Sequence, residues 1–217
     1  MLEVVSCLGV DRCVACDSHP PVAARGALDG HLCRTCLDVV PDHLTRLPVL
    51  PPGIESGWYL GSYAGPVGAM VRAGKYSGNE AVLWALGRHC GRNLDIRAID
   101  SVVAVPSSPW RRLVRGMNPA DLLAYPVAAD QGIPLFHPLV RRRSQAQARL
   151  LRRRRAQNAR DAYRVTCPVR GRVLLVDDVV TTGSTARACA EALLAAGAAE
   201  VHLLVVAASP GGIVPES

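Results

Sequence analysis

Three short apolar runs in the C-terminal part of the chain have the composition of buried β-strands. They are Ser101–Pro106 (SVVAVP), Arg172–Val176 (RVLLV) and Val201–Ala207 (VHLLVVA). A short run of β-branched and aliphatic residues bounded by turn-forming residues is typical of a strand that is buried on both faces. We therefore predict three buried strands.

Two segments between these strands have helical composition. Pro119–Ala129 is apolar enough for a buried helix, and Ser184–Ala196 is rich in Ala and Leu and contains no Pro or Gly. Gly197 follows directly and is a typical C-terminal stop. Strands that alternate with helices predict βαβ units, and hence an α/β fold with a parallel sheet flanked by helices.

The first 56 residues have a different character. Residues 1–40 are rich in cysteine and poor in long apolar runs, and residues 41–56 contain four prolines, which favour a linker. We expect a small cysteine-based module with its linker over residues 1–48 and the α/β domain over residues 49–217.

The composition is that of a globular protein. With 217 residues, 49% of them apolar, the chain is long enough for one core and a small additional module. No run of 18 apolar residues occurs, so we expect no membrane span. Glu3 stands where a secretory signal peptide carries cations, and we therefore expect a cytoplasmic protein.

The positive charge is concentrated in one segment. The net charge is +7, yet residues 131–160 contain nine Arg and no acidic residue, and the rest of the chain has 16 basic and 18 acidic residues. This distribution favours one anion-facing element over a generally basic surface. Lys75 is the single lysine among 25 basic residues, and a compact ammonium group differs from a guanidinium at a tight site.

The most informative stretch is Val173–Thr185, with the sequence VLLVDDVVTTGST. A buried strand brings two adjacent acids to its C-terminal end, a small hydroxyl-rich loop follows, and a helix begins at once. Ligands of open parallel sheets bind outside the carboxyl ends of the strands, and a helix N-terminus suits a phosphate. The predicted phosphate-binding residues are Thr181, Thr182, Gly183, Ser184 and Thr185.

The two adjacent acids indicate that the ligand contains a sugar as well as a phosphate. Asp177 and Asp178 are good acceptors for the two hydroxyl donors of a ribose diol, so the stretch fits a 5-phosphoribosyl group better than a bare phosphate or a nucleoside triphosphate. The alternative is an ordinary helix N-cap, but two charges after an apolar strand are costly without a partner. Only 39 residues follow Asp178, too few for a receiver domain, and the Walker pattern is absent.

The stretch closely resembles the signature of type I phosphoribosyltransferases, which bind phosphoribosyl pyrophosphate (PRPP). This resemblance implies the type I phosphoribosyltransferase fold. It also implies that Asp177 and Asp178 bind the ribose at the catalytic centre, and that residues 181–185 bind the 5′-phosphate.

Two basic segments are candidates for binding pyrophosphate. Arg111, Arg112 and Arg115 follow the predicted strand at 101–106, opposite the ribose site in the expected sheet, although a solvated basic turn is the alternative for each. Residues 141–160 (RRRSQAQARLLRRRRAQNAR) leave three alternatives open: a loop that closes over pyrophosphate, a nucleic-acid contact, or a solvated helix face.

Four cysteines have the spacing of a zinc ribbon. Cys13 and Cys16 form one C-x2-C pair, Cys33 and Cys36 form another, and sixteen residues separate the pairs. Two disulfides or inert thiols are the alternative, but a cytoplasmic location disfavours disulfides. We predict one structural Zn²⁺, and we expect Cys90 and Cys189 to be small core residues.

A four-cysteine ribbon in front of a type I phosphoribosyltransferase domain resembles the ComF family over nearly the whole chain. Further matching positions are Gly74-Lys75-Tyr76, Gly78, Val105–Ser108, Arg115–Asn118, Ser144, Gln147, Arg155, Asn158 and Ala162. Within these matching segments, the family favours an aromatic residue at Met117 and Thr at Ser144. Nearby, it favours Gln at Pro119 and Phe at Tyr163, so the chain departs from the family pattern at these four residues. The resemblance implies a link to DNA uptake and competence, with DNA-processing proteins as partners.

Two functions follow as hypotheses. The first is a phosphoribosyltransferase of unknown acceptor that binds PRPP with Mg²⁺, in which Lys75 and the 111–115 arginines stabilise the leaving pyrophosphate. The second is a non-catalytic adaptor that binds single-stranded DNA or partner proteins through the ribbon and the arginine-rich segment. A residue that stacks on an acceptor base is sought among Trp58, Tyr59, Tyr63 and Trp110, for which core packing is the alternative.

Overall fold

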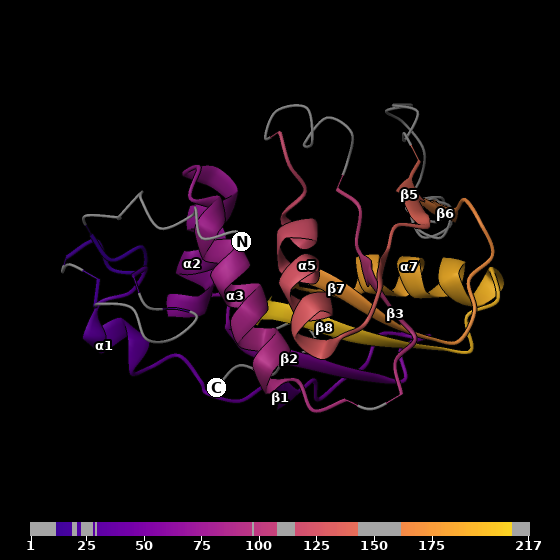
Figure 1. Ribbon diagram of the computed structural model, residues 1–217, viewed down its shortest axis with the longest axis horizontal. Helices are drawn as coiled ribbons and strands as arrows, with labels where there is room; N and C mark the ends of the chain where they lie inside the picture. Colours follow the sequence, from indigo (N-terminus) through magenta and orange to yellow (C-terminus); the bar gives the residue numbers. More distant parts are fainter. Residues whose placement is uncertain are drawn as a thin grey trace.

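The computed structural model describes residues 12–18, 21–22, 28, 30–96, 98–107, 116–142 and 162–209. A six-stranded sheet with the order β1-β2-β8-β7-β3-β4 forms its centre (Figure 1). The strands are β1 (Thr45–Arg46), β2 (Ser56–Ser62), β8 (Glu200–Ala208), β7 (Arg172–Val180), β3 (Ser101–Ala104) and β4 (Leu135–Phe136). All neighbouring pairs are parallel except β1 with β2, which confirms the predicted α/β architecture.

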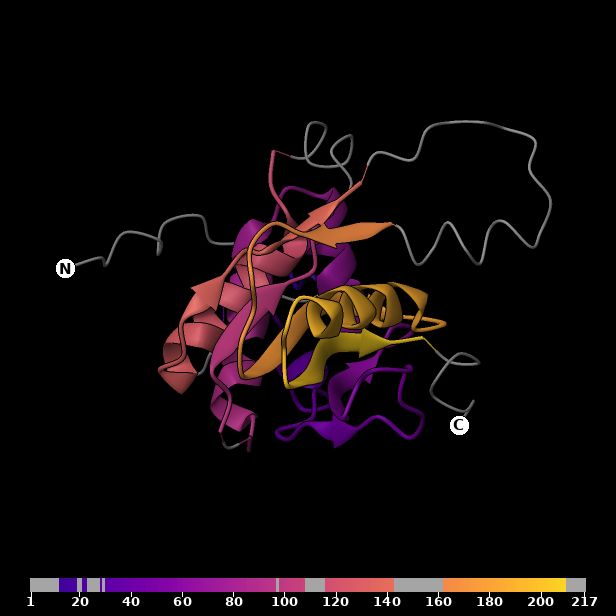
Figure 2. The same cartoon turned by 90° about the vertical axis from the view of Figure 1, so that its right-hand side faces the viewer.

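Helices cover both faces of this sheet. The described helices are α1 (Arg34–Leu37), α2 (Pro66–Tyr76), α3 (Glu80–Asn93), α5 (Pro119–Gln131) and α7 (Ser184–Ala195). Helices α2, α3 and α5 pack on one face, and α7 packs on the other (Figures 1 and 2). Because right-handed crossovers to strands on opposite sides place their helices on opposite faces, this arrangement follows from the strand order.

The predicted strands and helices correspond to β3, β7, β8, α5 and α7. Val102, Val103 and Leu174 are fully buried, as expected for strands covered on both faces. Strand β7 continues to Val180, four residues beyond the predicted end, so that the two acids belong to the strand itself. Helix α5 ends at Gln131, and its C-cap Gly132 has a φ of 66°, in the left-handed region.

The chain reverses its direction of winding between β3 and β7. From β3 the chain passes through α5 to β4 on one side, whereas from β7 it passes through α7 to β8 on the other side. The loops that leave the carboxyl ends of β3 and β7 therefore diverge toward opposite faces of the sheet. Such a reversal opens a crevice, and ligands of open α/β sheets bind there.

A separate antiparallel hairpin lies beside α7. It consists of β5 (Leu139–Arg141) and β6 (Tyr163–Val165), and the backbone N–H of Arg142 donates to the carbonyl of Ala162 at 2.8 Å. Residues 143–161, most of the predicted arginine-rich segment, lie outside the described residues. The two ends of that segment are thus joined at one place, next to α7.

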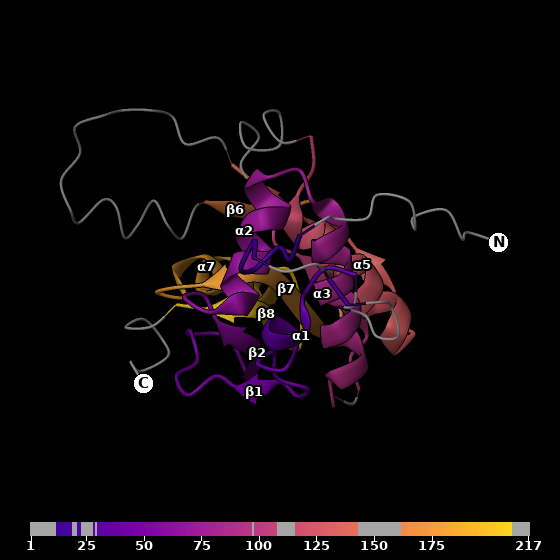
Figure 3. The same cartoon turned by 90° about the vertical axis from the view of Figure 1, so that its left-hand side faces the viewer.

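The cysteine-containing module lies at the opposite end of the molecule from α7 (Figures 1 and 3). Part of the predicted linker, Thr45–Arg46, forms strand β1 on the edge of the sheet, and His89 Nε2 of α3 lies 2.9 Å from the carbonyl oxygen of Pro41. The module is therefore tied to the sheet and to α3, and the domain boundary at residue 48 stays a prediction. None of the described helices has the length and apolar character that crossing a bilayer would require.

Candidate functional site

The loop after β7 has the geometry of an anion-binding turn. Gly183 has a φ of 73°, a conformation that favours glycine, and it is the N-cap of α7, which begins at Ser184. The hydroxyl of Thr182 donates to the hydroxyl of Ser184 at 3.2 Å. Free N–H groups at a helix N-terminus surrounded by hydroxyls are suited to hold a phosphate without a cationic side chain.

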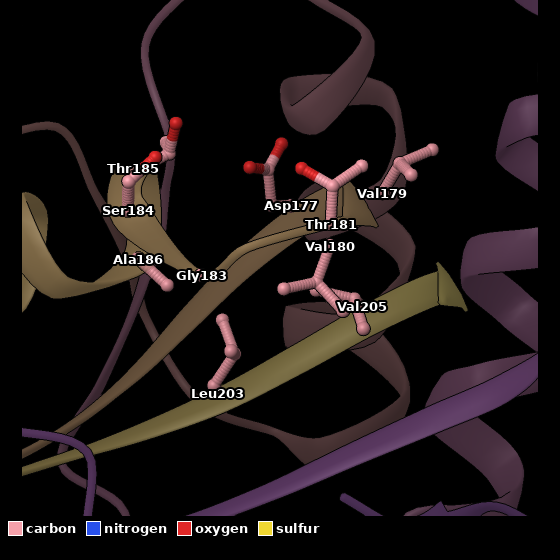
Figure 4. Close-up of a pocket in the computed structure, with 10 residues that line it drawn as sticks. All are labelled: Asp177, Val179, Val180, Thr181, Gly183, Ser184, Thr185, Ala186, Leu203 and Val205. Atoms are coloured by element: carbon pink, nitrogen blue, oxygen red, sulfur yellow. The ribbon is translucent and has the colours of Figure 1, made fainter. Parts of the chain in front are cut away.

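A pocket connects this turn with the first acid of the pair. Figure 4 shows the oxygen atoms of Asp177, Thr181 and Thr185 on the same side of β7. The apolar side chains of Leu203 and Val205 from the neighbouring strand line its base. The carboxyl group of Asp177 and the turn at 181–185 therefore line one cavity.

The two acids lie on opposite faces of the sheet because they are consecutive residues of one strand. Asp177 faces the pocket beside α7, whereas Asp178 faces α2 and pairs with Lys75. The backbone N–H of Asp178 donates to Oδ1 of Asp177 at 2.9 Å, which fixes the orientation of the first carboxyl group. The two carboxyl groups thus lie on either side of β7 near its carboxyl end.

The protonation of Asp177 is strongly perturbed. Desolvation, followed by repulsion from Asp178, raises the pKa of Asp177 from 3.8 to about 8. The hydrogen bond from the Asp178 backbone and the positive charges of Lys75 and Arg141 act in the opposite direction. Near neutral pH this pKa favours the protonated form of the Asp177 carboxyl group.

Lys75 reaches the site from α2. Its ammonium nitrogen lies 2.7 Å from Oδ2 of Asp178, and the two side chains are only 12% and 14% exposed. The sequence predicts Lys75 as a pyrophosphate contact, and that role stays a prediction. The structure places its ammonium group directly on one of the two acids.

Arg141 and Tyr163 lie near the pocket, and the sequence predicts no role in the site for either of them. They face each other across the β5–β6 hairpin, with the guanidinium carbon 5.7 Å from the centre of the Tyr163 ring. Burial raises the pKa of Tyr163 to about 12, and the positive charge of Arg141 acts on both Tyr163 and Asp177. Tyr163 is also one of the departures from the family pattern, which was the available signal.

The predicted pyrophosphate contacts Arg111, Arg112 and Arg115 lie outside the described residues. The described ends of their loop are close together, because the side-chain amide of Asn118 donates to the carbonyl of Val105 at 3.1 Å. Both residues are buried. The loop therefore leaves and returns at the carboxyl end of β3, which borders the crevice.

The four predicted metal ligands are brought together. The sulfur atoms of Cys13, Cys16, Cys33 and Cys36 all lie within 4.8 Å of one another, and those of Cys16 and Cys33 are 3.7 Å apart. Zn–S bonds of about 2.3 Å in a tetrahedron require sulfur separations of about 3.8 Å, so the cluster fits one Zn²⁺. A backbone hydrogen bond from Ser18 lowers the pKa of Cys16 to about 6, whereas burial raises the pKa of Cys36 well above its usual value. The sulfur geometry, rather than these opposed shifts, therefore carries the fit to a metal ion.

The other cysteines agree with the prediction where the structure describes them. Cys90 and Cys189 are buried in α3 and α7, as expected of small core residues, and Cys167 is exposed.

Of the aromatic candidates for base stacking, Trp58 is buried beneath Arg46, and Trp110 lies outside the described residues.

The raised pKa of Asp177 predicts a pH-dependent stability. Between the unfolded pKa near 3.8 and the folded pKa near 8, the folded state holds a proton that the unfolded state has lost. The parent protein therefore loses stability as pH rises through this range, whereas Asp177→Asn does not. We therefore expect the free energy of unfolding of Asp177→Asn, relative to that of the parent, to rise by roughly 1 kcal/mol or more from pH 5 to pH 8. Urea denaturation at several pH values measures this difference. Asp95→Asn removes an exposed carboxylate and is the control; an equal gain at every pH would contradict the assignment.

Comparison with known proteins shows the family of the chain. The family model described as phosphoribosyl transferase domain matches residues 148–217. The DNA utilization protein YhgH of Escherichia coli K12 is 34% identical over 188 residues, which cover 81% of this chain and 83% of that protein. Competence protein F of Haemophilus influenzae is 25% identical over 217 residues, covering 88% of this chain and 94% of that protein.

Among solved structures, glutamine PRPP amidotransferase from B. subtilis matches with 27% identity and a TM-score of 0.44. The match covers 57% of this chain and 25% of that one, so the chain spans about a quarter of the amidotransferase. The sequence relatives, by contrast, match over most of their own length. With its phosphoribosyltransferase-type domain and its four-cysteine cluster, the chain belongs to the ComF family of phosphoribosyltransferase-like proteins.

Proposed function

We propose that the protein binds a 5-phosphoribosyl group, such as that of PRPP, in the crevice at the carboxyl end of β7. The single observation that carries this proposal is the pocket that joins the carboxyl group of Asp177 to the turn at 181–185. The turn takes the 5′-phosphate through backbone N–H groups and hydroxyls. The carboxyl groups of Asp177 and Asp178, on either side of the strand tip, accept hydrogen bonds from the ribose hydroxyls.

With PRPP as ligand, we propose that the site supports transfer of the phosphoribosyl group. An acceptor attacks C1′ of the ribose, the bond from C1′ to the pyrophosphate oxygen breaks, and pyrophosphate leaves with the electron pair. Asp177 and Asp178 orient the ribose, and Lys75, Arg111, Arg112 and Arg115 supply positive charge near the leaving group. Mg²⁺ characteristically binds substrate phosphates, so we propose that it enters with the pyrophosphate.

Replacement of both acids tests the binding proposal. We expect the double variant Asp177→Asn/Asp178→Asn to lose roughly 50-fold in affinity for PRPP, because a hydrogen bond to the ion-paired carboxylate of Asp178 contributes about 1.5 kcal/mol and one to the neutral carboxyl group of Asp177 about 1 kcal/mol. Isothermal titration calorimetry measures this, with Asp95→Asn as the control. Unchanged affinity in the double variant would contradict the proposed ribose site. Release of pyrophosphate on addition of nucleobases, amines or nucleotides separates an enzyme from a binding protein.

A second candidate function is binding of single-stranded DNA. Two relatives of the chain are named for DNA utilization and for competence, and residues 152–155 are four consecutive arginines. We propose that this segment, with the cysteine module, contacts the phosphate backbone of DNA or partner proteins of DNA processing. Binding of this kind depends strongly on salt, because each phosphate contact releases condensed counterions.

Neutralising Arg152 to Arg155 tests the second function. Replacement of the four residues by Gln should reduce affinity for single-stranded DNA about tenfold or more. It should also make the negative slope of log K against log salt shallower by about 3. Fluorescence anisotropy with an oligonucleotide at several salt concentrations measures both quantities. Arg92→Gln/Arg170→Gln, which neutralises two exposed arginines elsewhere, is the control. An unaltered slope would exclude this segment as the contact.

We further propose that the cysteine cluster holds one structural Zn²⁺. Mass spectrometry of the purified protein should find about one zinc per chain, since four thiolates complete a tetrahedral site. Cys33→Ser should lose most of this zinc and melt at a lower temperature, because binding free energy at such sites is folding free energy. Cys167→Ser, at an exposed cysteine outside the cluster, should keep the zinc content and the melting temperature of the parent. Equal zinc content in the two variants would refute the site.

A further inference from the structure

The ribose subsite contains a cation of its own. The ammonium group of Lys75 lies 2.7 Å from Oδ2 of Asp178, within the range of a charge-assisted hydrogen bond. Both side chains are more than four-fifths buried, which distinguishes this pair from the exposed ion pairs of the surface. Because breaking a buried pair leaves an uncompensated charge, Lys75 and Asp178 behave as one unit.

The helices hold Lys75 in this position. Lys75 is in the last turn of α2, and the residue before it, Gly74, packs against Leu83 of α3 so closely that a Cβ atom at position 74 would collide with that leucine. Helix α2 in turn lies on the sheet face toward which Asp178 points. The close approach of α2 and α3 therefore sets the position of the ammonium group relative to the strand tip.

The charges in the subsite are already balanced. Burial raises the pKa of Asp177 to about 8, so this carboxyl group is neutral at pH 7, and the charge of Asp178 is offset by Lys75. The hydroxyls of Thr181, Ser184 and Thr185 carry no charge. Mg²⁺ requires oxygen ligands at about 2.0–2.1 Å and seeks negative charge. At Oδ2 of Asp178 it would have to displace the ammonium group, so the acid pair does not fit a protein-bound Mg²⁺.

We propose that Lys75 is the resident cation of the ribose subsite, and that the protein binds 5-phosphoribosyl monoesters without a divalent metal ion. This inference rests on the proposed phosphoribosyl site. An ammonium group has three donors, so that Lys75 can bond Asp178 and still donate to sugar oxygens. The ligands in question are sugar 5-phosphates and nucleoside 5′-phosphates, which lack the pyrophosphate that carries Mg²⁺ in PRPP.

Calorimetric titration with ribose 5-phosphate, in buffer with EDTA and in buffer with excess Mg²⁺, tests the proposal on the unaltered protein. We expect the dissociation constants in the two buffers to agree within about twofold. Titration with adenosine 5′-monophosphate in the same two buffers distinguishes a nucleotide ligand from a sugar phosphate. Neither measurement depends on a variant that has to fold.

Substitutions at the ion pair then test whether Lys75 is the reason that binding needs no Mg²⁺. Lys75→Met should bind ribose 5-phosphate about tenfold more weakly in EDTA, and Mg²⁺ should restore part of the loss, because the unpaired Asp178 then attracts a cation. The double variant Lys75→Met/Asp178→Asn removes both charges without leaving either one unpaired. We expect it to bind weakly and equally in both buffers.

The possible outcomes separate the two proposals. Binding of ribose 5-phosphate to the unaltered protein only in the presence of Mg²⁺ would overturn the role of Lys75 and leave the phosphoribosyl site intact. Absence of binding in both buffers would overturn the phosphoribosyl site and this inference with it. Equal binding in both buffers, with Mg²⁺ dependence in Lys75→Met, is the predicted result.

Discussion

The placement of two adjacent carboxyl groups at the end of one buried strand is the constraint on which the rest of the site depends. Val173, Leu174 and Leu175 are fully buried, and this apolar strand delivers Asp177 and Asp178 to a position of low solvation. Two neighbouring charges there are unfavourable. The protein resolves this conflict by a raised pKa at Asp177 and by an ion pair between Asp178 and Lys75. Both solutions reduce the net charge at the carboxyl end of β7, which is the basis of the proposed sugar site.

The topology of the sheet makes this tip accessible. Strands β3 and β7 are neighbours, yet their following helices lie on opposite faces. The alternation of side chains in β7 then directs Asp177 toward α7 and the turn at 181–185, and Asp178 toward α2. The carboxyl end of β7 therefore lies beside residues that are far apart in the sequence, from Lys75 of α2 to Thr185 at the start of α7.

Short-range sequence patterns predict the long buried strands, the helix after β7 and the cysteine cluster. The apolar runs of β3, β7 and β8, the alanine-rich helix α7 and the cysteine spacing are of this kind, and all are confirmed. Strands β4, β5 and β6 are two or three residues long, too short for a periodic pattern, and their pairing is decided by packing on β3 and α7. The pairing of Lys75 with Asp178, and the approach of Arg141 and Tyr163 to the site, depend on contacts between distant segments, which a single sequence does not encode locally.

A crystal structure of the protein soaked with ribose 5-phosphate tests the central claim most directly. The account predicts electron density for the phosphate within the turn from Thr181 to Thr185, with the sugar hydroxyls directed at the carboxyl groups of Asp177 and Asp178. A sugar phosphate bound elsewhere, or a phosphate in the turn with its sugar directed away from both acids, would contradict it.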